Sequence, residues 1–213
     1  MMKKINLEKI SKIVFFGSLW GLIEATIGYA LHVLPALIAG SLIFPIVMFI
    51  LYRTYKSLSD RKAVLFVGLI AIMIKATNLL LPFLPAPKTI NPMISMALQS
   101  LLVFLVIPLL DDQKLSIKSS GIIIASIGWR LGMIGYYFYN NLTTGFLDFR
   151  IASFEQGMSF VLYEGVVSGL LALALILLTN PMKSLARIDK IRINPIVSTT
   201  LLVLALIFTL VKF

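Results

Sequence analysis

The fold is decided by residues 63–84, which read AVLFVGLIAIMIKATNLLLPFL. An α-helix needs about 20 predominantly apolar residues to cross the hydrocarbon core of a bilayer, and this run meets that length with Lys75 as its one charged residue. The run therefore predicts a membrane-spanning helix. Lys75 is the feature within it that needs an explanation, because a charged side chain at mid-membrane is costly.

The rest of the chain shares this apolar character. Of its 213 residues, 59% are hydrophobic and 13% are charged, and the mean hydropathy is +0.99. A soluble domain has about 45–50% apolar and about 25% charged residues. The composition therefore predicts an integral membrane protein whose main solvent is lipid, with no chain left over for a separate soluble domain.

Hydrophobic runs between charged, proline-rich and glycine-rich breaks divide the chain into seven expected spans. They predict an all-α, polytopic transmembrane helix bundle, formed as one integral membrane domain over residues 1–213, with a six-helix core at 12–178 and an additional C-terminal helix. Pro45 lies inside the second span, where a proline favours a kink or break. The expected spans are 12–33, 35–52, 63–84, 92–110, 119–140, 157–178 and 195–213.

The distribution of lysine and arginine indicates the orientation. With the N-terminus in the cytoplasm, fourteen of these residues fall on the cytoplasmic side and three, Lys88, Arg150 and Lys212, fall outside. Cytoplasmic loops carry such an excess, so we expect an N-in, C-out protein. The net charge of +10 is then an orientation signal that also attracts anionic lipid, and no nucleic-acid partner is expected. The first span contains Glu24 and lacks a small-residue cleavage site, so we expect a retained helix rather than a signal peptide.

Four ionisable residues lie deep within the expected spans: Glu24, Lys75, Arg130 and Glu164. Each costs on the order of 2.5–3.5 kcal/mol at the centre of a spanning helix unless it is paired or faces water. Two are acidic and two are basic, and counting residues from the ends of the spans places all four in one layer. We therefore expect them to lie near one another, either as substrate-binding groups or as ion pairs that only fix helix packing.

The neighbours of these residues are polar, aromatic or small at helical spacing, as the lining of a polar pocket requires. His32 is expected at the membrane interface rather than in a proton relay. The loop at residues 82–92 is expected to be stiff because it is rich in proline, and the loop at 140–156, which contains Asp148 and Arg150, is a candidate lid over an outward-leaning pocket. The candidate binding residues are Glu24, Lys75, Asn78, Gln99, Arg130, Glu164, Trp20, Tyr137 and Phe160.

Sequence motifs for catalysis and for cofactors are missing. There are no cysteines, one histidine, and no nucleophile-elbow, zinc-protease or phosphate-loop motif. Asp111 and Asp112 are adjacent, but no second aspartate cluster accompanies them as magnesium-dependent lipid transferases need. We therefore expect no catalytic residues, no metal and no cofactor.

The expected span at 12–33 carries small residues at spacings of four, Gly17, Gly21 and Ala25, which let helices approach closely. This face, the size, the six-helix polar core over 12–178 and the outward-leaning pocket resemble the substrate-binding (S) component of energy-coupling-factor (ECF) vitamin transporters. Members of that family usually have alanines where this chain has Gly17 and Gly21, and they lack the seventh helix.

The resemblance implies a protein of the prokaryotic plasma membrane that captures a small nutrient from outside. It implies that Gly17, Gly21 and Ala25 contact a transmembrane coupling subunit, that two ATPase subunits complete the transporter, and that this chain binds no nucleotide. Arg130 and Lys75 would then meet an anionic group of the substrate. Two alternatives stay open: a subunit of a larger membrane complex whose buried charges carry protons or ions or fix assembly, and a membrane enzyme that acts on lipid.

Overall fold

The computed structural model describes residues 7–28, 36–179 and 193–211. These ranges are helical with no strand, so the all-α bundle expected from the sequence is confirmed. His32 and Pro35 lie outside the described residues. The elements in chain order are α1 (Leu7–Ile23), η1 (Glu24–Gly28), α3 (Ala36–Leu58), α4 (Arg61–Ala76), η2 (Thr77–Leu80), α5 (Pro87–Leu110), α6 (Leu115–Thr144), η3 (Phe149–Ile151), α7 (Phe154–Met158), η4 (Ser159–Tyr163), α8 (Glu164–Thr179) and α10 (Pro195–Leu210).

The helix ends follow from local capping chemistry. Asp60 precedes α4, and its carboxylate accepts a hydrogen bond of 2.9 Å from the Lys62 amide, which satisfies one of the free N–H groups of the first turn. Asn194 caps α10 in the same way, with Pro195 at the first helical position, where a missing N–H costs nothing. Gly145 ends α6 in the left-handed conformation (φ +73°), which glycine adopts without a steric penalty.

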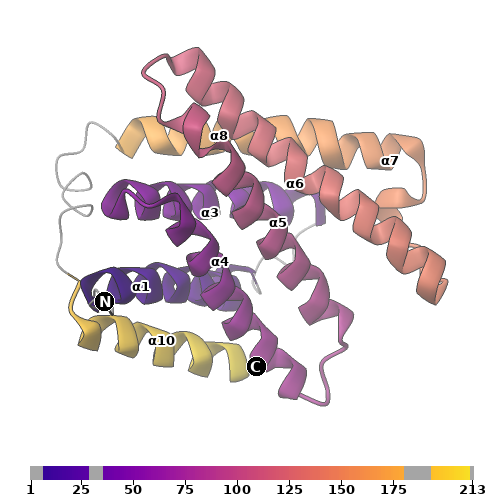
Figure 1. Cartoon of the computed structure of the whole chain (residues 1–213). Helices are drawn as coiled ribbons and strands as arrows, with labels where there is room; N and C mark the ends of the chain where they lie inside the picture. Colours follow the sequence, from indigo (N-terminus) through magenta and orange to yellow (C-terminus); the bar gives the residue numbers. More distant parts are fainter. Residues whose placement is uncertain (1–6, 29–35, 180–192, 212–213) are drawn as a thin grey trace, which may run out of the picture.

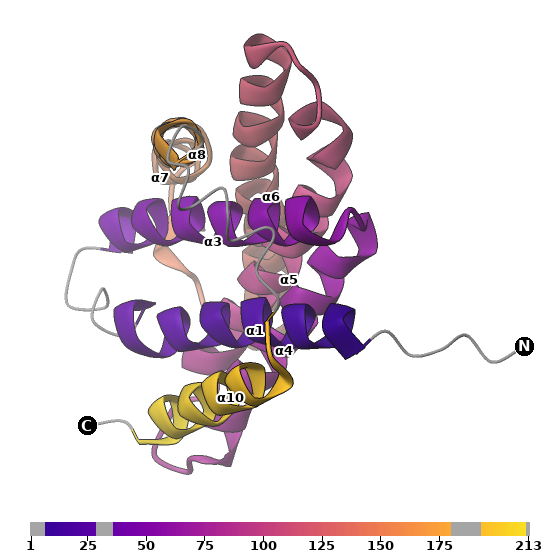
Figure 2. The same ribbon diagram turned by 90° about the vertical axis from the view of Figure 1, so that its left-hand side faces the viewer.

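The helices form two layers (Figures 1 and 2). One layer contains α10, α1, α3 and α8 as successive neighbours, and the second contains α4, α5 and α6, which cross the first obliquely. The second layer closes on the first through α1 with α4 and through α6 with α8. Helix α3 supplies the centre of the core, because Phe44, Val47, Met48 and Leu51 are fully buried between the layers.

Six of the helical segments are long and apolar enough to cross a membrane, which supports a multi-pass membrane protein. The seventh helix, α10, has 16 residues in the described part of the chain and is shorter than these six. It packs along α1, where the Ser198 hydroxyl donates a hydrogen bond of 2.8 Å to the Ser11 carbonyl. The last helix is thus attached to the edge of the bundle beside α1.

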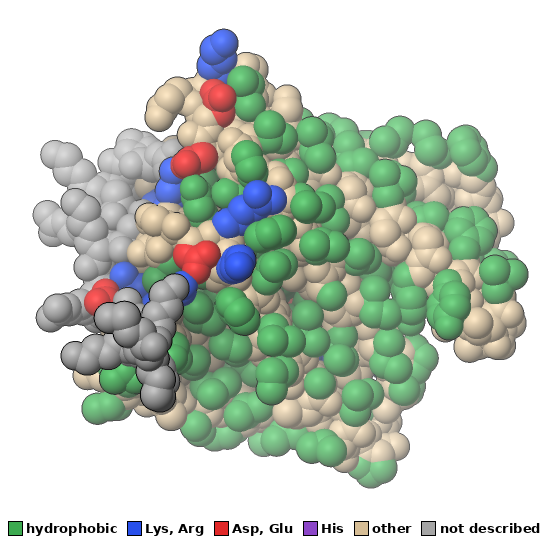
Figure 3. Space-filling view, viewed as in Figure 1, with side chains coloured by type: hydrophobic (Ala, Val, Ile, Leu, Met, Phe, Trp, Pro, Cys, Tyr) green, Lys and Arg blue, Asp and Glu red, His purple; other side chains and the backbone are tan. Residues whose placement is uncertain are grey.

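Charged side chains gather at one end of the molecule. Figure 3 shows blue and red side chains toward the left of the view and a mainly hydrophobic surface elsewhere on that face. Two ion pairs tie helix ends together there, Lys9 with Asp60 and Lys56 with Asp111. The hydrogen bond from Lys9 lowers the pKa of Asp60, and that from Lys56 lowers the pKa of Asp111. Which end faces the cytoplasm stays a prediction.

Three local expectations differ from the structure. Helix α3 continues without a break past Pro45. Helix α5 begins at Pro87 rather than at 92, so the stiff connection after η2 is shorter than expected. Helix α6 continues to Thr144, which reduces the expected 140–156 loop to a short link that contains η3. In each case a proline or a polar residue suggested a break, but a proline is tolerated where packing or the first turn of a helix accommodates its missing N–H.

Candidate functional site

The first two of the four ionisable residues form an ion pair between helices of opposite layers. Glu24 begins η1, and Lys75 lies in the last turn of α4. The Lys75 Nζ lies 3.4 Å from Glu24 Oε1, and both side chains are buried. Asn78, one turn beyond Lys75, is also buried. The expected mutual neutralisation of acid and base is therefore confirmed for this pair.

The second two lie at another interface, between α6 and α8. The Arg130 guanidinium donates to the Ser126 carbonyl (2.9 Å) and to the Ser126 hydroxyl (3.0 Å) on its own helix. Its cationic centre lies 4.5 Å from the ring of Trp129 and 5.8 Å from the ring of Phe160, distances at which a cation is attracted to an aromatic face. Glu164 interacts with Arg130 electrostatically across the interface.

Glycines on α8 bring these two helices close together. A Cβ placed on Gly165 would lie 2.9 Å from Ile127 Cγ1, and one on Gly169 would lie 3.3 Å from the Ile123 Cα. Glycine permits this approach without a shift of the neighbouring helix, and the spacing of four is typical of membrane helix crossings. Glu164 directly precedes the first of these glycines, so its side chain leaves the helix at the edge of the crossing.

Each buried glutamate adjoins a π-helical turn. Glu24 is the first residue of η1, and Glu164 follows η4 directly. A π-turn inserts an extra residue into the helical repeat and often occurs at functional sites. In η1 a Cβ on Gly28 would lie 3.1 Å from the Glu24 carboxyl carbon. The carboxylate of Glu24 therefore lies against Gly28, four residues later in the same turn.

A second arginine completes the cluster at α6 and α8. Arg150, in η3, donates hydrogen bonds to the Tyr137 hydroxyl (3.1 Å) and to Asp148 (3.2 Å). Its cationic centre also lies 5.2 Å from the ring of Phe160, so two guanidinium groups face this one aromatic side chain. These contacts hold the link after α6 against the bundle. From the sequence, Arg150 is expected only as part of a candidate lid. Helical spacing predicts which residues share a face, and a loop residue has no such spacing from which its contacts could be predicted.

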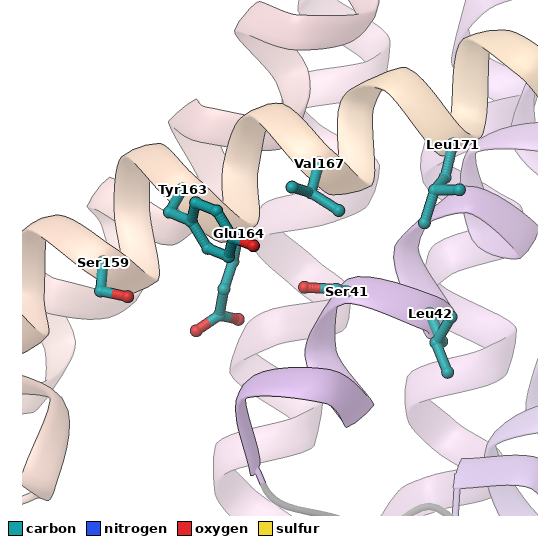
Figure 4. A pocket seen from close by; sticks show the side chains of 7 residues that line it. All are labelled: Ser41, Leu42, Ser159, Tyr163, Glu164, Val167 and Leu171. Atoms are coloured by element: carbon teal, nitrogen blue, oxygen red, sulfur yellow. The ribbon is translucent and has the colours of Figure 1, made fainter.

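Glu164 also faces a cavity between α3 and α8 (Figure 4). The cavity has a volume of ≈ 270 Å³. Glu164 lines it from the α8 side, and Ser41 and Leu42 line it from α3. Glu164 is 2% exposed, yet within the described ranges neither carboxylate oxygen accepts a hydrogen bond. The lining residues are Ser41, Leu42, Ser159, Tyr163, Glu164, Val167 and Leu171.

Other buried polar atoms near this interface also have no hydrogen-bond partner in the described chain. They are the Ser168 hydroxyl, one turn after Glu164, and the indole N–H of Trp129. Trp129 stacks on Phe44 of α3 at 6.2 Å between ring centroids and meets Phe160 edge-on at 6.0 Å. A buried polar group without a partner costs about 1–3 kcal/mol. Helix α1 also has such atoms, at Ser18 and Trp20, so what distinguishes the α6–α8 interface is that a carboxylate, that of Glu164, is among them.

The remaining candidate binding residues lie apart from this cluster. Trp20 of α1 is fully buried near Gly68 of α4, and Gln99 of α5 donates to the Ser95 hydroxyl at 2.8 Å. With Asn78 and the Glu24–Lys75 pair, they belong to other interfaces and do not line the cavity. Of the nine candidate binding residues, the described contacts join Arg130, Glu164, Tyr137 and Phe160 into one cluster through Arg150.

The small-residue face of α1 packs within this chain. A Cβ on Gly17 would lie 2.7 Å from Ile70 Cβ, and one on Gly21 would lie 2.7 Å from Ile74 Cδ1, both on α4. Ala25 is buried as well. The glycines therefore have an intramolecular partner, and their contact with a coupling subunit stays a prediction.

In the described ranges no group of three or more His, Cys, Asp or Glu side chains could hold a metal ion. No protein-family model, no curated protein and no solved structure matches the chain. The functional conclusion therefore depends on the geometry of the Glu164 cavity alone.

Proposed function

We propose that this protein is a membrane-embedded binding protein for a small polar solute. We propose further that it acts as the substrate-binding component of an uptake transporter of the energy-coupling-factor type, with a coupling subunit and two ATPases as partners. The observation that carries the binding function is the Glu164 carboxylate, which is buried, faces a cavity and accepts no hydrogen bond from the described residues. An ionised carboxylate without a partner is costly in such a place, and a ligand that donates a hydrogen bond to it would remove that cost.

The proposal assigns the contact with the solute differently from the sequence-based expectation. Lys75 is paired with Glu24, and Arg130 is bonded to Ser126 and lies against Trp129. Neither cation lines the cavity. Glu164 therefore replaces them as the group that meets the solute, and Arg130 offsets its charge from the side.

The proposal is tested by purifying the tagged protein gently from its own membranes and applying native mass spectrometry. We expect a bound small molecule and the co-isolation of a polytopic coupling subunit with two ATPases. Liposomes that contain this assembly should then take up the molecule only when ATP is supplied. Uptake that proceeds equally without ATP contradicts the transport function.

A second candidate function rests on the Glu24–Lys75 pair. This pair lies at the α1–α4 crossing and does not line the Glu164 cavity. Both features are expected of a pair that fixes helix packing or transfers protons in a larger membrane complex. The same purification decides between the two functions. Co-isolation of redox or proton-translocating subunits, with no bound molecule, favours the second.

A further inference from the structure

The cavity between α3 and α8 also indicates the chemical class of its ligand. We infer that it takes a small uncharged molecule with an apolar ring and an N–H or O–H group that donates to Glu164. This inference rests on the proposed binding function and deepens it. It differs from the anionic ligand expected from the sequence, because that expectation depended on two cations that the structure places outside the cavity.

The carboxylate of Glu164 in the cavity wall favours a ligand that donates hydrogen bonds. An ionised carboxylate only accepts hydrogen bonds, so a group that meets Glu164 in its ionised form has to donate. Figure 4 shows the carboxylate extending from α8 toward the side of α3, with Ser159 on the same element as Tyr163. Both Glu164 oxygens are buried, and neither accepts a hydrogen bond from the described chain. A group with two N–H donors, such as a primary amide, matches this arrangement.

The balance of charge around Glu164 favours an uncharged ligand. Two cations, Arg130 and Arg150, interact electrostatically with Glu164, and Arg150 is itself paired with Asp148 at 3.2 Å. The four groups together carry no net charge when all are ionised. An anionic ligand would meet the carboxylate at contact distance, and a cationic ligand would leave one unbalanced charge within the membrane layer, where it costs several kcal/mol. An uncharged ligand disturbs neither balance.

The size and the apolar lining of the cavity favour a small ligand with an apolar ring. Leu42, Val167 and Leu171 give it apolar walls, and Leu42, Tyr163 and Leu171 are exposed side chains at its mouth. Since these helices are membrane spans, an uncharged molecule reaches the mouth without carrying a charge into lipid. A volume of ≈ 270 Å³ lies just below the range of about 300–1,000 Å³ typical of drug-sized ligands, so one ring with one polar group is a suitable size.

The experiment uses three probes that share a ring and differ in charge: benzamide, benzoate and benzamidinium. Each is measured by equilibrium dialysis at the same millimolar concentrations against the full chain in nanodiscs, with empty nanodiscs as the blank. We expect benzamide to bind most tightly and benzoate most weakly. Equal binding of all three, preference for either ion, or no binding of benzamide overturns the inference.

Two variants and a control assign the effect to the carboxylate. Glu164→Leu should weaken benzamide binding by about tenfold or more, because it removes the acceptor. Glu164→Gln keeps the shape and one acceptor oxygen, so it should retain part of the benzamide affinity while losing the discrimination against benzoate. Glu155→Leu removes an exposed carboxylate from the neighbouring helix α7. It should change neither the affinity for benzamide nor the discrimination against benzoate. Unchanged binding in Glu164→Leu overturns the inference.

The two proposals fail in distinguishable ways. Selective benzamide binding by a protein that assembles with no ATPase and supports no uptake removes the transport function and leaves the ligand class standing. ATP-dependent uptake of an anion by an assembly that contains this chain supports the transport function and overturns the ligand class.

Discussion

The two acid–base pairs of this protein lie in similar settings and are arranged differently. In both, a glutamate beside a π-turn faces a base on a helix of the other layer, next to a glycine-lined crossing. Glu24 contacts Lys75 directly, whereas Glu164 accepts no hydrogen bond from the described residues and opens onto a cavity. The comparison indicates that a buried charge by itself does not mark a binding site. A buried charge that its own protein leaves without a hydrogen bond is the stronger sign.

The largest effect is expected from breaking the ion pair between Glu24 and Lys75, here called the direct pair. Lys75→Met leaves Glu24 as an uncompensated buried charge and should lower the free energy of unfolding by about 3–5 kcal/mol. The measurement is reversible denaturation in mild detergent. The double variant Glu24→Gln with Lys75→Met should recover most of the loss, because it removes both charges together.

The matched change at the second pair sharpens the contrast. Glu164→Gln removes a carboxylate that has no hydrogen bond to lose, but it also removes the charge that offsets Arg130 and Arg150, so the free energy of unfolding should fall by less than it does for Lys75→Met. If Glu164→Gln lowers the free energy of unfolding as much as Lys75→Met in the same denaturation experiment, both pairs stabilise the fold equally. The distinction between a directly bonded pair and a carboxylate without a hydrogen bond is then wrong.

An intermediate effect is expected at the crossing that supports the direct pair. Gly17→Ala places a Cβ 2.7 Å from Ile70 Cβ, so helix α1 has to move away from α4, at about 1–3 kcal/mol. Gly135→Ala is the control, since a Cβ there meets nothing within 4 Å, and by helix propensity it should be neutral or stabilising by up to about 1 kcal/mol. Comparable losses in the two variants would mean that close packing at Gly17 is not the cause.

A smaller effect is expected from the link that borders the second pair. Tyr137→Phe removes the hydroxyl that accepts a hydrogen bond of 3.1 Å from Arg150 and keeps the ring that faces the guanidinium. The loss of stability should be about 1 kcal/mol. Hydrogen exchange should also increase at residues 145–153, because the link is held less firmly. Faster exchange in α1 instead would contradict a local role.

The smallest effect is expected at the charged end of the bundle. Asp60→Asn keeps a capping side chain for α4 but removes the ion pair with Lys9, at about 0.2–1 kcal/mol since both side chains are partly exposed. The hydrogen bond from Lys9 lowers the folded-state pKa of Asp60 below its usual value of 3.8. The stabilisation is therefore present above the unfolded-state pKa and is lost as the pH falls through the lowered folded-state value. The difference between Asp60→Asn and the unaltered protein should be constant at neutral pH and disappear in strong acid.

Much of the fold follows from residue patterns. The apolar run around Lys75 and its counterparts predicted helices long and apolar enough to span a membrane, and all four ionisable residues within them are buried in the protein. The breaks were less predictable. Pro45 lies within a continuous helix, and residues 87–91 are helical although three prolines precede or follow them closely. A proline restricts its own backbone, but the packing of the helix around it decides whether the helix continues.

The sequence by itself determined that the chain crosses a membrane, which residues are apolar enough to do so, and that four charges lie among them. Only the tertiary structure decided that Glu24 pairs with Lys75, that Arg150 joins the Arg130 cluster, and that Glu164 faces a cavity. The physical reason is that hydropathy and depth are properties of one helix, whereas pairing depends on which faces of two helices meet. That choice is set by close glycine contacts and by π-turns, which shift the helical repeat just where the two glutamates lie.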